Sequence, residues 1–151
     1  MSPQDVLDAL TAAVPGVGGE VAFGQATLDV PAARWVEAAR VARDQLGAEY
    51  FDWLSAVDDG AAGLVVIVHL WSLPGRFHVL LRTRVSDDGA ALDSLTGVFP
   101  GAAWHERETV EMFGLRLVGF DDGSGQGVRP LLLAEEFPGH PLRKDFSSPQ
   151  Q

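Results

Sequence analysis

Apolar side chains recur at helical spacing in two stretches of the first third of the chain. Over residues 3–14 they return every three or four positions, and Ser2 is placed to cap this helix ahead of Pro3. Over residues 31–46 they gather on one side of a second helix, which begins at a proline and ends at Gly47. Between these helices, two short extended pieces are expected within residues 20–30.

The centre of the chain changes to a pattern that is typical of a β-sheet. Residues 50–57, 64–71 and 77–85 are rich in aromatic and β-branched side chains, and turns containing glycine or proline separate them. In the third stretch, apolar side chains at positions 77, 79 and 81 alternate with largely polar ones. This alternation predicts one face toward a core and one toward solvent or a neighbour. The sequence Asp87-Asp88-Gly89 predicts a turn at its end.

The last third of the chain has one more regular unit and then loses its periodicity. A helix is predicted over residues 102–113, closed by Gly114, with a short strand over residues 115–118. Residues 119–151 are mostly irregular, and we expect them to be a docking tail completed by another surface. The whole pattern predicts one α+β domain, residues 1–151. It has a central, mostly antiparallel or mixed sheet flanked by helices.

Composition limits the classes of partner. The 151 residues suit a single domain, and 21 Asp and Glu against 11 Lys and Arg give a formal net charge of −10. An acidic surface repels phosphate backbones and anionic lipid headgroups, so we expect protein partners, no nucleic acid and no direct membrane insertion. No stretch approaches the ~20 consecutive apolar residues of a membrane helix, and the first residues lack a secretory signal. We therefore expect a cytoplasmic chain.

Candidate chemistry within the chain is weak. Cysteine is absent, which excludes disulfides, thiolate catalysis and thiolate-ligated iron–sulfur clusters. His105-Glu106 begins like a helical zinc-protease motif, but Thr109 stands where the second histidine ligand is needed. Residues 123–127 lack the G-x-G-x-x-G spacing and a lysine for phosphate, so we interpret them as a flexible surface loop. The four histidines show no ligand-like spacing, and we expect no metal or cofactor in this chain.

Charged residues on the predicted helix 102–113 allow three interpretations. Arg107 and Glu111, four residues apart, are placed to pair on a solvated surface. Two carboxylates could also act as general acid and general base, although the sequence shows no adjacent nucleophile or substrate pocket. In the third interpretation, Glu106 and Glu108 form a recognition face for arginines of a partner.

A second charged segment, residues 140–145, has two interpretations. Pro141 fixes its own backbone and favours an extended His140, which presents consecutive side chains to a neighbour. Arg143 is then placed to bind a carboxylate through two hydrogen bonds. An ordinary basic turn explains the same residues equally well.

Two motifs, taken in order, point to a known family. Residues 104–115 read Trp-His-Glu-Arg-Glu-Thr-Val-Glu-Met-Phe-Gly-Leu, and residues 139–146 read Gly-His-Pro-Leu-Arg-Lys-Asp-Phe. The first is similar to a signature of Glu-Arg-Glu, three residues and Met-Phe-Gly, and the second to a hallmark that follows it. Residues 51–58 are similar to the strand that opens the family's central sheet. The chain thus resembles the 30 kDa subunit of respiratory complex I, the proton-pumping NADH-quinone oxidoreductase.

The resemblance implies a non-catalytic subunit in the peripheral arm of a translocase that passes electrons to quinone. It implies docking beside the quinone-site subunit and the subunit with the terminal iron–sulfur cluster, on the inner face of the cell membrane. Iron–sulfur clusters, flavin and quinone are then expected on partner subunits. The residues carried over as partner-docking are Glu106, Arg107, Glu108, Met112, Phe113, Gly114, His140, Pro141, Arg143 and Asp145.

Two departures from the family pattern leave alternatives open. Val110-Glu111 replaces an aromatic residue followed by Asp, and residues 119–122 with their glycine-rich loop replace a compact Gly-His-Pro turn. Relatives of this subunit also serve membrane-bound hydrogenases and complexes with other electron donors, so the donor stays open. A free-standing soluble adaptor and an independent enzyme are the alternatives outside respiration.

Overall fold

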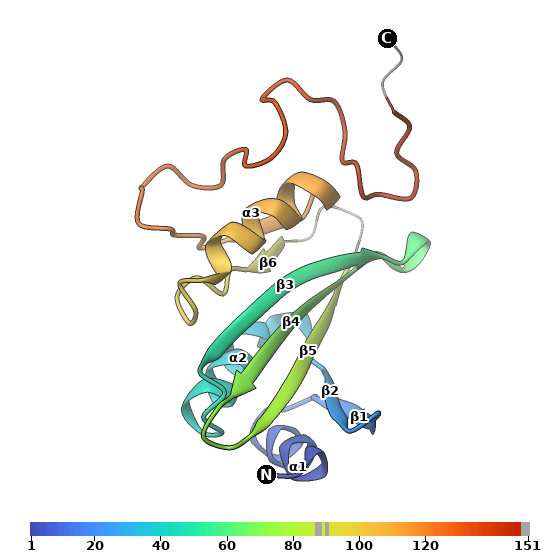
Figure 1. Ribbon diagram of the computed structural model, residues 1–151. Coiled ribbons are helices and arrows are strands. Elements are labelled where there is room, and N and C mark those ends of the chain that lie inside the picture. Colours follow the sequence, from blue (N-terminus) through green and yellow to red (C-terminus); the bar gives the residue numbers. More distant parts are fainter. Residues whose placement is uncertain (87–88, 90, 149–151) are drawn as a thin grey trace.

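The computed structural model describes residues 1–86, 89 and 91–148 (Figure 1). Its α-helices are α1 (Pro3–Ala13), α2 (Trp35–Asp44) and α3 (Ala102–Phe113), with short 3-10 turns at Ala32–Arg34 and Gly60–Ala62. Its strands are β1 (Gly18–Ala22), β2 (Gln25–Asp29), β3 (Tyr50–Asp58), β4 (Leu64–Ser72), β5 (Phe77–Val85), β6 (Ala91–Asp93) and β7 (Arg116–Val118). These elements confirm the predicted α+β class.

The strands form a large mixed sheet and a small one. The large sheet has the order β1-β2-β5-β4-β3, in which β2 pairs with β5 in parallel and the other neighbours are antiparallel. In the small sheet, β6 pairs with β7 in parallel. The mixed sheet is as expected, whereas β6 is a strand that the sequence did not predict.

One face of the large sheet carries the core. Phe77, Val79 and Leu81 of β5 are buried, and the residues between them are partly exposed, which confirms the predicted alternation. Helix α2 lies behind the sheet in Figure 1, and α1 lies at the lower end of the sheet. Leu10 of α1 and Trp35 of α2 belong to the same buried cluster. Helix α3 runs along β3, the last strand in the sheet order, and so lies at the border between the sheet and the tail.

The ends of the helices follow the local sequence. The Asp5 N–H donates to the Ser2 hydroxyl at 3.1 Å and the Ser2 N–H donates to the Asp5 carboxylate at 2.8 Å, so Ser2 caps α1 as predicted. The second helix begins at Trp35 rather than at residue 31, because extended backbone at Pro31 and a 3-10 turn precede it. Its predicted start is therefore early by about one turn.

Two further predictions concern the connections and the membrane. The turn expected at Asp87-Asp88-Gly89 includes Asp87 and Asp88, which lie outside the described residues. Across residues 1–86, 89 and 91–148, none of the helices is long and apolar enough to cross a membrane.

Candidate functional site

The two family-like motifs lie against each other at α3. The tail that follows β7 runs back over this helix and contacts it through residues 129–133 and 139–146 (Figure 1). We call α3 together with these two tail segments the α3–tail clasp.

Glu106 lies on the inner side of the α3–tail clasp and is 1% exposed. Its carboxylate accepts a hydrogen bond from the Ser94 hydroxyl at 2.6 Å and one from the Leu95 N–H at 2.8 Å. Burial raises the pKa of Glu106, and these two hydrogen bonds oppose the rise. The Ser94 hydroxyl also lies 2.8 Å from that of Thr96, which accepts the Asp121 N–H at 3.1 Å. Glu106 therefore ties the loop after β6 to α3 and, through Thr96, to the start of the tail.

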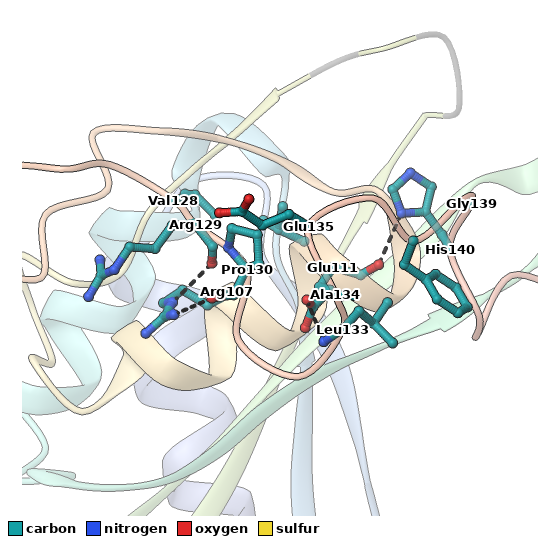
Figure 2. Close-up of a pocket in the computed structure, with 12 residues that line it drawn as sticks. Arg107, Glu111, Val128, Arg129, Pro130, Leu133, Ala134, Glu135, Gly139 and His140 are labelled. Carbon is teal, nitrogen blue, oxygen red and sulfur yellow. Dashed lines mark hydrogen bonds between the residues drawn. The ribbon is translucent and has the colours of Figure 1, made fainter.

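Arg107 and Glu111 point from α3 toward the first tail segment (Figure 2). Arg107 donates to the carbonyl oxygens of Arg129 at 3.1 Å and Pro130 at 2.6 Å. Glu111 accepts the backbone N–H groups of residues 131, 132 and 133 at 3.2, 2.8 and 2.9 Å. The hydrogen bonds of both side chains thus go to the tail, which corrects the predicted surface pair between them: the tail supplies closer partners for each.

The environment of Glu111 favours its ionised form. Burial alone opposes ionisation, but the three backbone donors and the nearby Arg107 cation together lower the pKa of Glu111. An ionised carboxylate forms stronger hydrogen bonds than a neutral one. Glu111 is therefore the anionic anchor of the first tail segment.

The second tail segment caps the C-terminal end of α3. The carbonyl oxygens of residues 111, 112 and 113 meet His140 Nδ1 at 3.0 Å, the Leu142 N–H at 3.0 Å and Arg143 Nε at 2.6 Å, in that order. The last carbonyls of an α-helix have no partner inside the helix, so these donors satisfy groups that would otherwise need water. The Arg143 cation is also favourable at the negative end of the helix dipole.

Gly114 lets the tail approach this closely. It ends α3 in the left-handed conformation with φ 76°, as predicted. A Cβ at this position would lie 2.8 Å from the ring of His140. Glycine is thus required both by the backbone conformation and by the histidine that packs on it.

Asp58, at the end of β3, is a second anchor for the tail. Its carboxylate accepts the Lys144 N–H at 2.8 Å, and its other oxygen lies 3.8 Å from a guanidinium nitrogen of Arg143. The hydrogen bond from Lys144 and another from the Gly60 N–H lower the pKa of Asp58. Arg143 therefore links the end of α3 to the end of β3, so the tail contacts both.

The glycine-rich loop is organised around an aspartate. The Asp122 carboxylate accepts the hydroxyl of Ser124 at 2.6 Å and its N–H at 3.0 Å, and also binds the Arg129 guanidinium. The Ser124 hydroxyl, its N–H and Arg129 hold the pKa of Asp122 well below its usual range. Residues 123–127 are exposed, as expected for a surface loop.

A small hollow opens between α3 and the tail (Figure 2). Its volume is about 220 Å³, and Val110, Leu133 and Phe137 contribute to its apolar lining. This is below the ~300–1,000 Å³ of ordinary small-molecule sites. The Glu111 carboxylate beside it already accepts three hydrogen bonds from the tail, so this carboxylate is not free to act as a general base.

A separate polar cluster crosses the large sheet. His69 Nδ1 lies 2.8 Å from the Asp52 carboxylate, and His69 Nε2 lies 2.7 Å from His78 Nδ1. Trp71 stacks on His78 with ring centroids 4.5 Å apart. Burial and the neighbouring His69 lower the pKa of His78. These contacts join β3, β4 and β5, and the two histidines meet only because the strand register brings them together.

The predicted docking residues occupy three kinds of environment. Inside the α3–tail clasp, contacts to other parts of the chain are made by Arg107, Met112, Phe113, Gly114, His140 and Arg143. Glu106 faces the interior, and Pro141 is half-buried. Glu108 and Asp145 are exposed. The docking role of this set remains a prediction.

Two residues that hold the tail, Glu111 of the clasp and Asp58 of β3, were not predicted from the sequence as docking residues. Glu111 was considered only as a partner of Arg107, and the contact of Asp58 depends on where the tail passes. Among the side chains of residues 1–86, 89 and 91–148, no group of three or more His, Asp or Glu is arranged to hold a metal ion.

Fold and clasp together define a class: a small α+β module that holds its own C-terminal tail against one helix. Residues 28–151 match the model of the family described as the respiratory-chain NADH dehydrogenase 30 Kd subunit. The chain belongs to this family.

Curated relatives agree with that membership. An NADH-quinone oxidoreductase subunit from Phenylobacterium zucineum (strain HLK1) is 37% identical over 134 residues, which cover 87% of this chain and 61% of that protein. The equivalent subunit from Roseiflexus sp. (strain RS-1) is 36% identical, over 93% of this chain and 81% of that protein. In the comparison with Phenylobacterium, the chain therefore spans less than two thirds of its relative's length.

Two solved structures share the fold. One is a chain in the structure of the membrane-bound sulfane sulfur reductase, an archaeal respiratory membrane complex, with a TM-score of 0.76 and 22% identity. That match covers 95% of this chain and 85% of the other. The other is the trypsin-resistant fragment (1–134) of Nqo5, with a TM-score of 0.65 and 22% identity over 79% of this chain and 97% of that one.

Proposed function

We propose that this chain is a non-catalytic peripheral-arm subunit of a proton-pumping NADH:quinone oxidoreductase. It docks beside the quinone-site subunit and the subunit with the terminal iron–sulfur cluster, on the inner face of the cell membrane. It holds no cofactor, and the flavin, iron–sulfur clusters and quinone belong to its partners.

The α3–tail clasp carries this proposal. In this member of the family, both motifs that resemble the hallmarks of the 30 kDa subunit are used to fix α3 and the tail to each other. The clasp turns an irregular segment into a shaped surface at the border of the sheet. Such a surface favours recognition of a protein, because a fixed backbone loses less conformational entropy on binding than a mobile one.

The assembly test uses a tagged chain in its native host. Membranes are extracted with mild detergent, and the proteins that co-purify are identified by mass spectrometry. We expect the quinone-site subunit, the iron–sulfur subunit and membrane subunits. An NADH-binding flavoprotein in the same material identifies NADH as the donor, and its absence indicates a related complex with another donor. A tagged chain found alone in the soluble fraction refutes the docking role.

Arg143→Ala tests the contribution of the clasp to docking. The substitution removes the hydrogen bond to the Phe113 carbonyl and the contact with Asp58, both of which position the tail. We expect the isolated domain to stay folded by circular dichroism and its recovery with the complex to fall at least about tenfold, a loss of ~1.4 kcal/mol of binding. Arg116→Ala is the matched control, because Arg116 is an exposed arginine on β7. Equal recovery of both variants excludes Arg143 as an anchor.

A further inference from the structure

The turn between β1 and β2 has an unusual composition. The Ala22–Gln25 pair closes the hairpin, so Phe23 and Gly24 form a two-residue turn. Both have positive φ, 54° for Phe23 and 72° for Gly24. Hairpin turns of this kind favour Asn or Asp at the first position, since few other side chains tolerate the left-handed conformation. A bulky aromatic residue there is an outlier.

The side chain of Phe23 is not buried by its own chain, so packing does not offset this backbone strain. Its side chain is fully exposed, at 107% of the reference area, which is the highest value among the large hydrophobic residues of the described chain. Single exposed apolar residues are common and need no explanation. Phe23 differs from these residues because its backbone is strained as well. An Asn at this position would remove both the backbone strain and the exposed apolar surface. Outliers of this kind tend to mark sites of function.

The β1–β2 hairpin that carries Phe23 is held in place by the core and by the large sheet. Residues Ala26 and Leu28 of β2 are both 0% exposed and belong to the core. The same strand pairs with β5 in the large sheet from Ala26 to Asp29. Phe23 therefore projects from a fixed element rather than from a mobile loop, so little conformational entropy is lost when a partner encloses it.

The charges near the hairpin indicate what kind of surface the hairpin can bind. The first 33 residues contain Asp5, Asp8, Glu20 and Asp29 but no lysine, arginine or histidine. This N-terminal unit, comprising α1 and the β1–β2 hairpin, therefore carries acidic and no basic side chains of its own, while Arg82 of the adjacent β5 pairs with Asp29. Such a surface favours a basic protein surface and disfavours anionic lipid headgroups. The hairpin also lies almost wholly ahead of residue 28, where the match to the family model begins.

We propose that Phe23 inserts as an aromatic anchor into an apolar pocket, bordered by Lys or Arg, on a neighbouring protein subunit. This second contact goes beyond the α3–tail clasp and rests on the proposed function, because it assigns the pocket to another subunit of the complex. Buried aromatic anchors dominate the energetics of many protein interfaces.

Substitutions at position 23 separate this role from a structural one. Phe23→Asn suits the turn but removes the ring, so the isolated chain should melt at the same or a higher temperature. Tagged Phe23→Asn and untagged wild-type chains are expressed together in the host. The variant's share of the detergent-extracted complex should fall at least tenfold below its share of the lysate. Phe23→Leu retains an apolar side chain and should recover most of the loss. Leu73→Asn, at another turn where Leu73 is 68% exposed, controls for lost surface hydrophobicity and should assemble like wild type.

A photo-crosslinker at position 23 then identifies the pocket. With p-benzoylphenylalanine in the assembled complex, we expect a cross-link to one protein peptide that contains apolar residues and Lys or Arg. Equal incorporation of Phe23→Asn and wild type, or a cross-link to lipid only, overturns the anchor and leaves the docking role through α3 intact. Failure of the wild-type chain to enter any complex removes the docking role, and this inference with it.

Discussion

Replacing Glu111 by Gln should release the first tail segment from α3 while the domain stays folded. In the wild type, one carboxylate holds three successive backbone N–H groups, those of residues 131–133. Gln has the same shape but lacks the charge, and it offers one acceptor oxygen where Glu111 offers two. Its amide nitrogen would face a backbone donor. The substitution therefore removes the anionic anchor without leaving a cavity.

The expected loss of free energy depends on how far the held segment is exposed to water. A hydrogen bond to a charged group contributes about 1.5–3 kcal/mol when it is shielded from water. Leu132 is 61% exposed, so water can replace part of what its backbone loses. We therefore assign about 0.5–1 kcal/mol to each bond. One Glu111 oxygen accepts the N–H groups of residues 131 and 133, so a Gln oxygen in its place keeps these two bonds at about half their strength, and the bond to residue 132 is lost. The net loss of ~1–2 kcal/mol corresponds to an increase of about 5- to 30-fold in the opening equilibrium of the segment.

Native-state hydrogen exchange followed by mass spectrometry measures this opening directly. Peptides that cover residues 129–133 should exchange about 5- to 30-fold faster in Glu111→Gln, while peptides from β4 remain as protected as in the wild type. Glu108→Gln is the matched control, since it makes the same chemical change on an exposed residue of the same helix. Unchanged exchange in Glu111→Gln, or the same acceleration in both variants, would refute the anchoring role of this carboxylate.

Two other predictions concern stability. Phe113 is 5% exposed and part of the core, so Phe113→Ala should lower the free energy of unfolding by about 3–5 kcal/mol in urea titrations, and a loss below about 1 kcal/mol would contradict the packing. Because the folded-state pKa of Glu106 is raised, its titration should make the wild type lose stability relative to Glu106→Gln as pH rises from about 4.3 through that raised value. Thermal melting of both proteins between about pH 4 and pH 7 checks this, and a constant difference between them would rule out such a titration.

The fold was largely predictable because periodicity is a local property. The helix expected over residues 102–113 has those bounds in α3, and the alternation in β5 gave its buried face correctly. The strand β6 was missed because its three residues show no pattern of their own. They become a strand by pairing with β7, a partner more than twenty residues further along the chain.

The sequence indicated some residues of the clasp but not their contacts. The sequence drew attention to Arg107, His140 and Arg143 but left their partners open, since these depend on the path of an irregular tail. The burial of Glu106 depends on the rotation of α3 about its axis. Asp58 is one aspartate among many until Lys144 is brought to it across the fold.

The contacts within the clasp leave only part of the surface of α3 available to a neighbouring subunit. Glu106 faces the interior, while Arg107 and Glu111 are engaged by the tail. The exposed residues of this helix are Trp104, at 68%, and Glu108. They lie four residues apart and therefore on one strip of the surface. An exposed tryptophan beside an exposed carboxylate is a combination that suits an apolar pocket flanked by arginine. Of the two glutamates expected to meet a partner's arginine, Glu108 is thus the one that can do so without opening the clasp.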